Sequence, residues 1–194
     1  MNKSCPSPQN VFKSPRYAGG VLAGIFLFLG AAQAQHAHHH AHKHGHAKLE
    51  VSLEQGRLSL ELVSPMDNLV GFEHAPKNDR QTKALAELQG LLENPANFFE
   101  PNKEALCSKE KVLFRSHLFG DAHGDAPKAD KGHADLRYQV SFNCKAADAL
   151  KEVNVTAFKA FRRLHEIETQ LVTDRPGSQA RAFELGKRNT LIRF

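Results

Sequence analysis

The sequence lacks the short motifs that mark the commonest catalytic folds. It contains no GxSxG elbow, no P-loop and no GxGxxG turn. A segment that begins at His165-Glu166 comes close to the HExxH motif of zinc proteases, but Thr169 stands where the second histidine is required and the surroundings alternate like a strand. No nucleophile is available, because we also expect the cysteines to be oxidised. We therefore expect that the protein is not an enzyme.

Long apolar runs are also absent. The longest, residues 21–31, is shorter than the about 20 residues that a membrane span needs. Three basic residues precede it and the small residues Ala32-Gln33-Ala34 follow it, which is the order of a secretory signal peptide. We expect residues 1–34 to be removed after Ala34 and the mature chain not to be inserted in a membrane.

Little net charge remains after that removal. The chain has 26 Lys+Arg and 21 Asp+Glu, a net charge of +5, and the signal segment holds three of the basic residues and none of the acidic ones. The mature chain therefore carries about +2, from 23 basic and 21 acidic residues. Because nucleic-acid binding depends on a clustered basic surface, we expect no nucleic-acid partner.

Of the three cysteines, Cys5 lies in the signal segment, so Cys107 and Cys144 remain. They are too far apart in sequence for a CxxC metal or redox site. An even pair in an exported protein is typical of a disulfide, because the compartments outside the cytosol are oxidising. We expect these two cysteines to be joined.

The folded region begins with a pattern typical of a β-hairpin. Residues 48–54 and 57–62 alternate apolar and polar side chains, and Gln55-Gly56 separates the two runs. A two-residue connection that contains glycine favours a tight turn. The apolar positions are Leu49, Val51, Leu53, Leu58, Leu60 and Leu62.

The rest of the chain combines one helix with several short strands. Leucines at helical spacing predict a helix over residues 78–94, ended by Pro95, and a polar stretch without periodicity predicts a loop over residues 119–133. Short strands are expected in residues 112–118, 136–142, 151–158, 165–174, 179–185 and 190–194. We predict a single α+β domain over residues 48–194, with a mainly antiparallel sheet and helices on one side.

Between the signal segment and this domain lies a histidine-rich tract, residues 35–47. Imidazole is the commonest metal ligand in proteins, and alternating histidines can bring two or three rings onto one ion. With no residues to build a core, the tract should be disordered without metal. The expected metal ligands here are His36, His38, His39, His40, His42, His44 and His46.

Four isolated histidines are further candidate ligands. His117, His123 and His133 fall between the two cysteines, so a disulfide would restrict the segment that carries them. His74 lies beside Glu73 in "GFEHAP". A lone histidine in a loop is more often a surface residue than a ligand, so these positions depend on what surrounds them.

The whole arrangement resembles the ZrgA-type family of periplasmic zinc-uptake proteins. The resemblance rests on a tract ending "HGHA", the segment "SPMDNLVGFEHAPK", a helix, a cysteine, a polar loop and the pattern Y-x-V-x-F-x-C. It implies zinc ligands in the tract and, in the polar loop, at His123 and His133. Many relatives fill that loop with histidine and acidic residues, whereas this loop has two histidines, so the tract is expected to carry more of the binding.

We therefore expect a zinc-binding protein in the periplasm of a Gram-negative bacterium, which captures Zn²⁺ and passes it toward a zinc ABC importer or its solute-binding protein. A copper or nickel sequestering protein is an alternative, because Cu²⁺ binds imidazole sites more tightly than Zn²⁺ does. Met66, the single methionine of the mature chain, argues against a Cu⁺ carrier. A metal-dependent hydrolase would need ligands fixed on strands, an open position and a general base.

Overall fold

The computed structural model describes residues 43–120 and 134–194. The expected signal segment, five of the tract histidines (residues 36–42) and the loop histidines His123 and His133 lie outside the described residues. Within the described residues, no helix is long and apolar enough to cross a membrane.

The predicted hairpin is confirmed. Strand β1 (His46–Glu54) pairs antiparallel with β2 (Arg57–Pro65), with Glu54 opposite Arg57. The two connecting residues have positive φ, 50° at Gln55 and 81° at Gly56, as a tight turn between twisted strands requires. All six alternating apolar side chains of the hairpin are buried.

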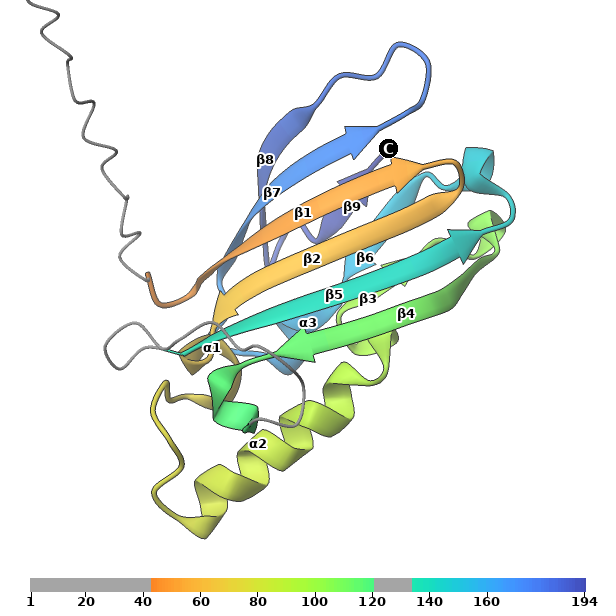
Figure 1. Cartoon of the computed structure of the whole chain (residues 1–194). Helices are drawn as coiled ribbons and strands as arrows, with labels where there is room; N and C mark the ends of the chain where they lie inside the picture. The colour runs from red at the N-terminus through yellow and green to blue at the C-terminus, as the bar shows by residue number, and fades with distance from the viewer. Residues whose placement is uncertain (1–42, 121–133) are drawn as a thin grey trace, which may run out of the picture. The chain divides into compact units, whose positions relative to one another are not determined.

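The hairpin lies at the centre of a six-stranded sheet of order β4-β5-β2-β1-β7-β8 (Figure 1). Each strand of this sheet pairs antiparallel with its neighbour, except that β1 and β7 run parallel. The predicted mainly antiparallel α+β class is therefore confirmed. The other strands are β4 (Cys107–Arg115), β5 (Asp135–Cys144), β7 (Glu166–Thr173) and β8 (Arg181–Gly186).

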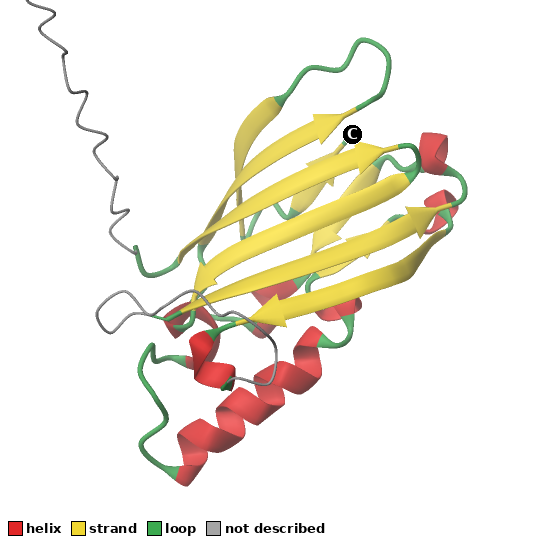
Figure 2. Cartoon of the chain, viewed as in Figure 1, coloured by secondary structure: helices red, strands yellow, loops and turns green. Residues whose placement is uncertain are grey.

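A three-stranded sheet and the helices pack on one side of the large sheet (Figure 2). No helix of residues 43–120 or 134–194 covers the other face. The longest helix, α2 (Asp79–Leu92), begins after Asn78, whose side chain accepts a hydrogen bond from the N–H of Gln81. The small sheet consists of β3 (Phe99–Pro101), β6 (Glu152–Val155) and β9 (Leu191–Arg193), and the short helices are α1 (Asp67–Val70) and α3 (Ala157–Ala160).

One continuous core joins both sheets to α2. Tyr138 of β5 is buried in it, 4.7 Å between ring centroids from Phe98, and its hydroxyl donates a hydrogen bond of 2.8 Å to the carbonyl of Leu92 at the end of α2. Burial raises the pKa of this phenol well above its ordinary value. The hydroxyl thus ties the helix end to the sheet.

The predicted disulfide is confirmed, and its position follows from the register. Cys107, the first residue of β4, lies opposite Cys144, the last residue of β5, and a disulfide joins them. Arg115 and Arg137 face each other near the other end of this pair of strands, so the disulfide lies at the end away from the connection between β4 and β5.

Two local predictions differ from the structure. The strand expected over residues 112–118 begins earlier and ends at Arg115, because the side chain of Ser116 accepts a hydrogen bond from the N–H of Leu118 and starts a 3₁₀ turn over His117–Phe119. His117 therefore lies in this turn and not at a strand end. The strand expected over residues 151–158 ends at Val155, and the short helix α3 follows it over Ala157–Ala160.

Candidate metal centre

The last two histidines of the tract lie within the described residues, on either side of Gly45. We call His44, Gly45 and His46 the junction. Strand β1 begins at His46, two residues before the expected start of the domain, so the tract leads into the sheet without a spacer. The junction is therefore the part of the histidine tract that joins the first strand of the sheet.

Three backbone hydrogen bonds hold Gly45 in place. Its N–H donates to the side-chain Oδ1 of Asn68 in α1 at 2.6 Å, and its carbonyl accepts from the N–H groups of His165 and Glu166 at 2.8 and 3.0 Å. Asn68 is buried and also donates, through Nδ2, to the carbonyl of His46 at 2.9 Å. The junction backbone is therefore fixed to α1 and to the start of β7.

Position 45 requires glycine for two reasons. Its φ of +86° lies in the left-handed region, which residues with a Cβ rarely adopt. A Cβ built there would also lie 2.7 Å from Cδ2 of His165, so that the imidazole would have to move. The sequence HGH thus places one imidazole on each side of a closely packed backbone position.

The imidazole of His44 lies between two carboxylates. Its Nε2 is 3.4 Å from Oε1 of Glu73, and its Nδ1 is 3.8 Å from Oδ2 of Asp67. Asp67 also faces the guanidinium of Arg163, with Oδ1 accepting from Nη2 at 3.2 Å. The side chain of His44 is 59% exposed, whereas that of Glu73 is 8% exposed. An exposed ring therefore covers a buried carboxylate.

His46 has a different environment, on the uncovered face of the sheet. It lies opposite Glu166 in the parallel register of β1 and β7, and its Nδ1 is 2.9 Å from Oε1 of Glu166. A carboxylate that holds one nitrogen of an imidazole leaves the other available, which is the usual arrangement around histidines that bind metal. His46 lines a pocket of about 390 Å³ that also contains Asp135, Glu168 and Glu184.

The other predicted ligands in the described residues are His74 and His117, which belong to other segments of the chain. A ring nitrogen of His74 is 2.8 Å from the carbonyl of Ala75, and the ring centroid is 5.5 Å from that of Phe72. His117 lies in the 3₁₀ turn after β4. Between residues 43 and 120 and from 134 onward, no three His, Cys, Asp or Glu side chains are arranged to hold a metal ion.

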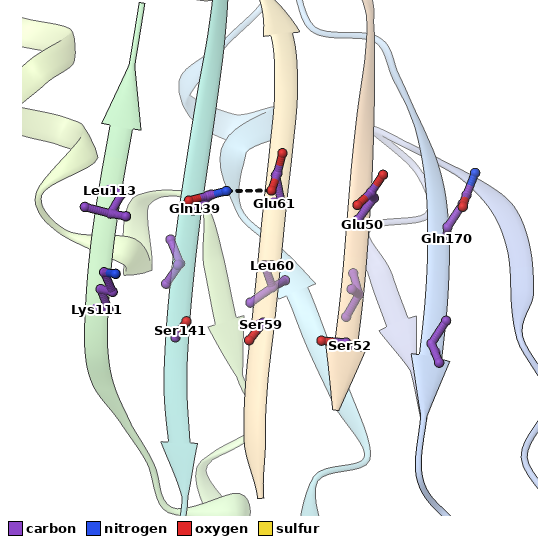
Figure 3. A pocket seen from close by; sticks show the side chains of 13 residues that line it. Glu50, Ser52, Ser59, Leu60, Glu61, Lys111, Leu113, Gln139, Ser141 and Gln170 are labelled. Atoms are coloured by element: carbon purple, nitrogen blue, oxygen red, sulfur yellow. Dashed lines mark hydrogen bonds between the residues drawn. The ribbon is translucent and has the colours of Figure 1, made fainter. Parts of the chain in front are cut away.

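A second pocket, of about 510 Å³, lies on the uncovered face of the large sheet. Its polar lining consists of serines, glutamines, Glu50, Glu61 and Lys111, and Nε2 of Gln139 donates to Glu61 at 2.7 Å (Figure 3). No imidazole lines it. For a metal that prefers nitrogen ligands, the junction is the better candidate.

Sequence reasoning identified the histidines of the junction but not their neighbours. Asp67, Asn68 and Glu73 all come from "SPMDNLVGFEHAPK", the segment that carries most of the family resemblance. The family resemblance of that segment could have drawn attention to these residues, because three of its polar side chains face the junction. Glu166 and His165 had no such signal, since they reach the junction through the pairing of β7 with β1.

Residues 41–194 match the family described as ZrgA family zinc uptake protein, a span that includes the junction and all described elements. A comparison with curated protein sequences gives no match.

Proposed function

The chain belongs to the ZrgA family of zinc uptake proteins, and from this membership we propose that it captures Zn²⁺ in the periplasm of a Gram-negative bacterium and passes it toward a zinc importer. The proposed partner is a zinc ABC importer or its solute-binding protein. The proposed role is one of binding and transfer, without catalysis.

The observation that carries this proposal is the histidine tract that ends on a fixed anchor. Seven histidines occupy residues 36–46, and the last two belong to the junction that Asn68 and β7 hold. Many imidazoles close together raise the local ligand concentration, so an ion that leaves one set meets another before it diffuses away. Such exchange suits a donor, whereas a closed four-ligand site retains its metal.

The proposed location rests on two features. The first is the signal-like order of residues 1–34, with cleavage proposed after Ala34. The second is the Cys107–Cys144 disulfide, since such bonds form and persist in oxidising compartments such as the periplasm. In our proposal the imidazole-rich chain captures zinc in that compartment, before the ion crosses the inner membrane.

Calorimetric zinc titration of residues 35–194 tests the proposal. The anchor at Gly45 shows where to cut: deletion of residues 36–42 removes five histidines and leaves the junction intact. This variant should bind fewer zinc ions and keep the unfolding free energy of the parent, because the deleted residues are five histidines and two alanines, a composition that does not build a core. A variant of residues 35–194 in which the same five histidines are changed to serine keeps the chain length and is the control for the deletion. Equal zinc stoichiometry in parent and both variants would contradict the proposal.

The metal itself is tested by composition. Protein purified from periplasm without a tag and without metal-affinity resin should contain zinc in excess of copper and nickel. Stoichiometric copper in its place would favour the sequestering alternative. Tightly held metal in the variant that lacks residues 36–42 would instead point to a closed site in the domain, as a metal-dependent hydrolase requires.

A further inference from the structure

We infer that His44 Nε2 and Glu73 Oε1 form an open zinc site at the junction, where an ion passes between the tract and the folded domain. The inference rests on the proposed zinc function and adds a ligand, Glu73, that the sequence pattern did not indicate. Both donor atoms lie within the described residues 43–120.

The spacing of the two donor atoms is the first argument. A hydrogen bond between a charged nitrogen donor and a carboxylate is about 2.7–2.9 Å long, and the separation here is 3.4 Å. In a tetrahedral site with Zn–N and Zn–O distances of about 2.0–2.1 Å, two donor atoms lie about 3.3–3.4 Å apart. An ion placed slightly off the line between Nε2 and Oε1 therefore reaches both at bonding distance.

The burial of Glu73 is the second argument. A carboxylate loses hydration when it is buried, and a nearby cation offsets that cost more strongly in the low dielectric of the interior than in water. Asp67 adds a second carboxylate at the opposite nitrogen of the ring, and Arg163 pairs with Asp67. The charge of Glu73 faces the exposed imidazole of His44, which is the side from which an ion would arrive.

The fixed backbone is the third argument. The hydrogen bonds of Gly45 to Asn68, His165 and Glu166 hold the residue next to His44, so the ring stays within reach of Glu73. Two protein donors leave the other positions of the ion to water or to an incoming ligand. An open site of this kind exchanges its ion quickly, whereas structural zinc has four protein ligands.

Thermal unfolding of residues 35–194 with and without Zn²⁺ tests the site. His44 and Glu73 come together only in the folded state, so an ion shared by them binds the folded state and raises the unfolding midpoint. An ion held by residues 36–42 alone would bind folded and unfolded chains alike and would leave the midpoint unchanged. The variants are Glu73→Gln, which keeps the shape of the side chain, and His44→Ala, at an exposed position. Glu87→Gln, on the exposed side of α2, is the matched control.

The parent and the Glu87→Gln variant should show the zinc-induced rise, and the Glu73→Gln and His44→Ala variants should lose most of it. The double variant should lose no more than either single variant, because both changes remove the same ion. If Glu73→Gln prevents folding, His44→Ala carries the test.

A parent that binds zinc by titration without a rise in midpoint, or with a rise that both variants keep, would overturn the site and leave the proposed function standing. A parent that binds no zinc at all would overturn both.

Discussion

The backbone N–H of Gly45 donates a hydrogen bond of 2.6 Å to Oδ1 of Asn68, a residue 23 positions further along the chain. The bond is buried, and the same side chain donates to the carbonyl of His46. Asn68→Ala would leave the buried N–H of Gly45 without its acceptor, and one unsatisfied buried group typically costs about 1–3 kcal/mol. We expect the unfolding free energy to fall by about 1–3 kcal/mol, measured by urea denaturation.

A matched control is Asn143→Ala, the same change at an exposed position of β5. Its effect should stay within about 0.5 kcal/mol. Equal stability of the two variants would mean that Asn68 does not hold the junction.

Gly45→Ala should destabilise the protein more than the same change at another glycine with positive φ. The left-handed backbone alone costs a residue with a Cβ about 1–2 kcal/mol, and the contact with Cδ2 of His165 adds to it. Gly177 has a φ of +77° and no atom within 4 Å of a built Cβ, so Gly177→Ala measures the backbone cost alone. If the two variants are equally stable, the ring of His165 moves freely and the junction is looser than the structure indicates.

Two further variants complete that comparison. Gly90→Ala, in the last turn of α2 with open space around it, should stabilise the protein by about 0.5–1 kcal/mol, because glycine weakens a helix. His165→Ala should partly restore the stability of the Gly45→Ala variant, because it removes the ring that the new Cβ meets.

The elements of this fold were predictable where a local pattern sets them. Alternation and a two-residue turn were enough to predict the β1–β2 hairpin, and the helical spacing of the leucines before Pro95 was enough for α2. The parallel pairing of β1 with β7 was not predictable, because it joins His46 to Glu166 across most of the domain and no local signal specifies it. The small sheet has the same origin in long-range pairing.

The candidate site divides in the same way. His44 and His46 were identifiable as ligand types from composition alone. The carboxylates around them were not, because Asp67 begins α1, Glu73 lies in the segment after α1, and Glu166 begins β7. A glycine between two histidines gives no indication by itself that it will pack against a third histidine, His165.

The disulfide should contribute strongly to stability. Cys107 and Cys144 are 37 residues apart, and closing a loop of that length is worth about 4 kcal/mol on the chain-entropy model. The variant with both cysteines changed to alanine should lose about 2–5 kcal/mol of unfolding free energy. Thiol titration of the denatured parent should find no free thiol in residues 35–194, and two free thiols in material from the periplasm would contradict the bond.

Tyr138 provides a spectroscopic test of the core. The chain has two tyrosines and no tryptophan, and since Tyr17 lies in the signal segment, Tyr138 is the single tyrosine of residues 35–194. Burial raises its pKa well above the ordinary value near 10. In the folded protein the absorbance of tyrosinate should therefore be absent at pH 11, while the urea-unfolded chain should titrate with a midpoint near 10.

The same shift makes stability depend on pH. A pKa raised in the folded state means that ionisation favours the unfolded chain, so the contribution of Tyr138 is complete below pH 10 and is lost as the pH rises above it. Tyr138→Phe should flatten this alkaline loss and lower stability at pH 7 by about 0.5–1.5 kcal/mol, because it removes the hydrogen bond to Leu92. An unchanged alkaline slope in that variant would show that other groups cause the loss.

Zinc affinity should fall steeply as the pH falls from 7.5 to 5.5. A metal-bound imidazole must be neutral, and an imidazole in water has a pKa near 6.5, so protons and Zn²⁺ compete for the same nitrogen over this range. If three tract histidines share one ion, the three penalties multiply, and the affinity falls by about two orders of magnitude or more. The polar stretch of residues 119–133 also contains Asp121, Asp125 and Asp130, and such carboxylates would stay ionised down to about pH 4. Zinc titrations of residues 35–194 at the two pH values, with the five-serine variant as control, measure the difference. An affinity that hardly changes would move the main site from the tract to these carboxylates.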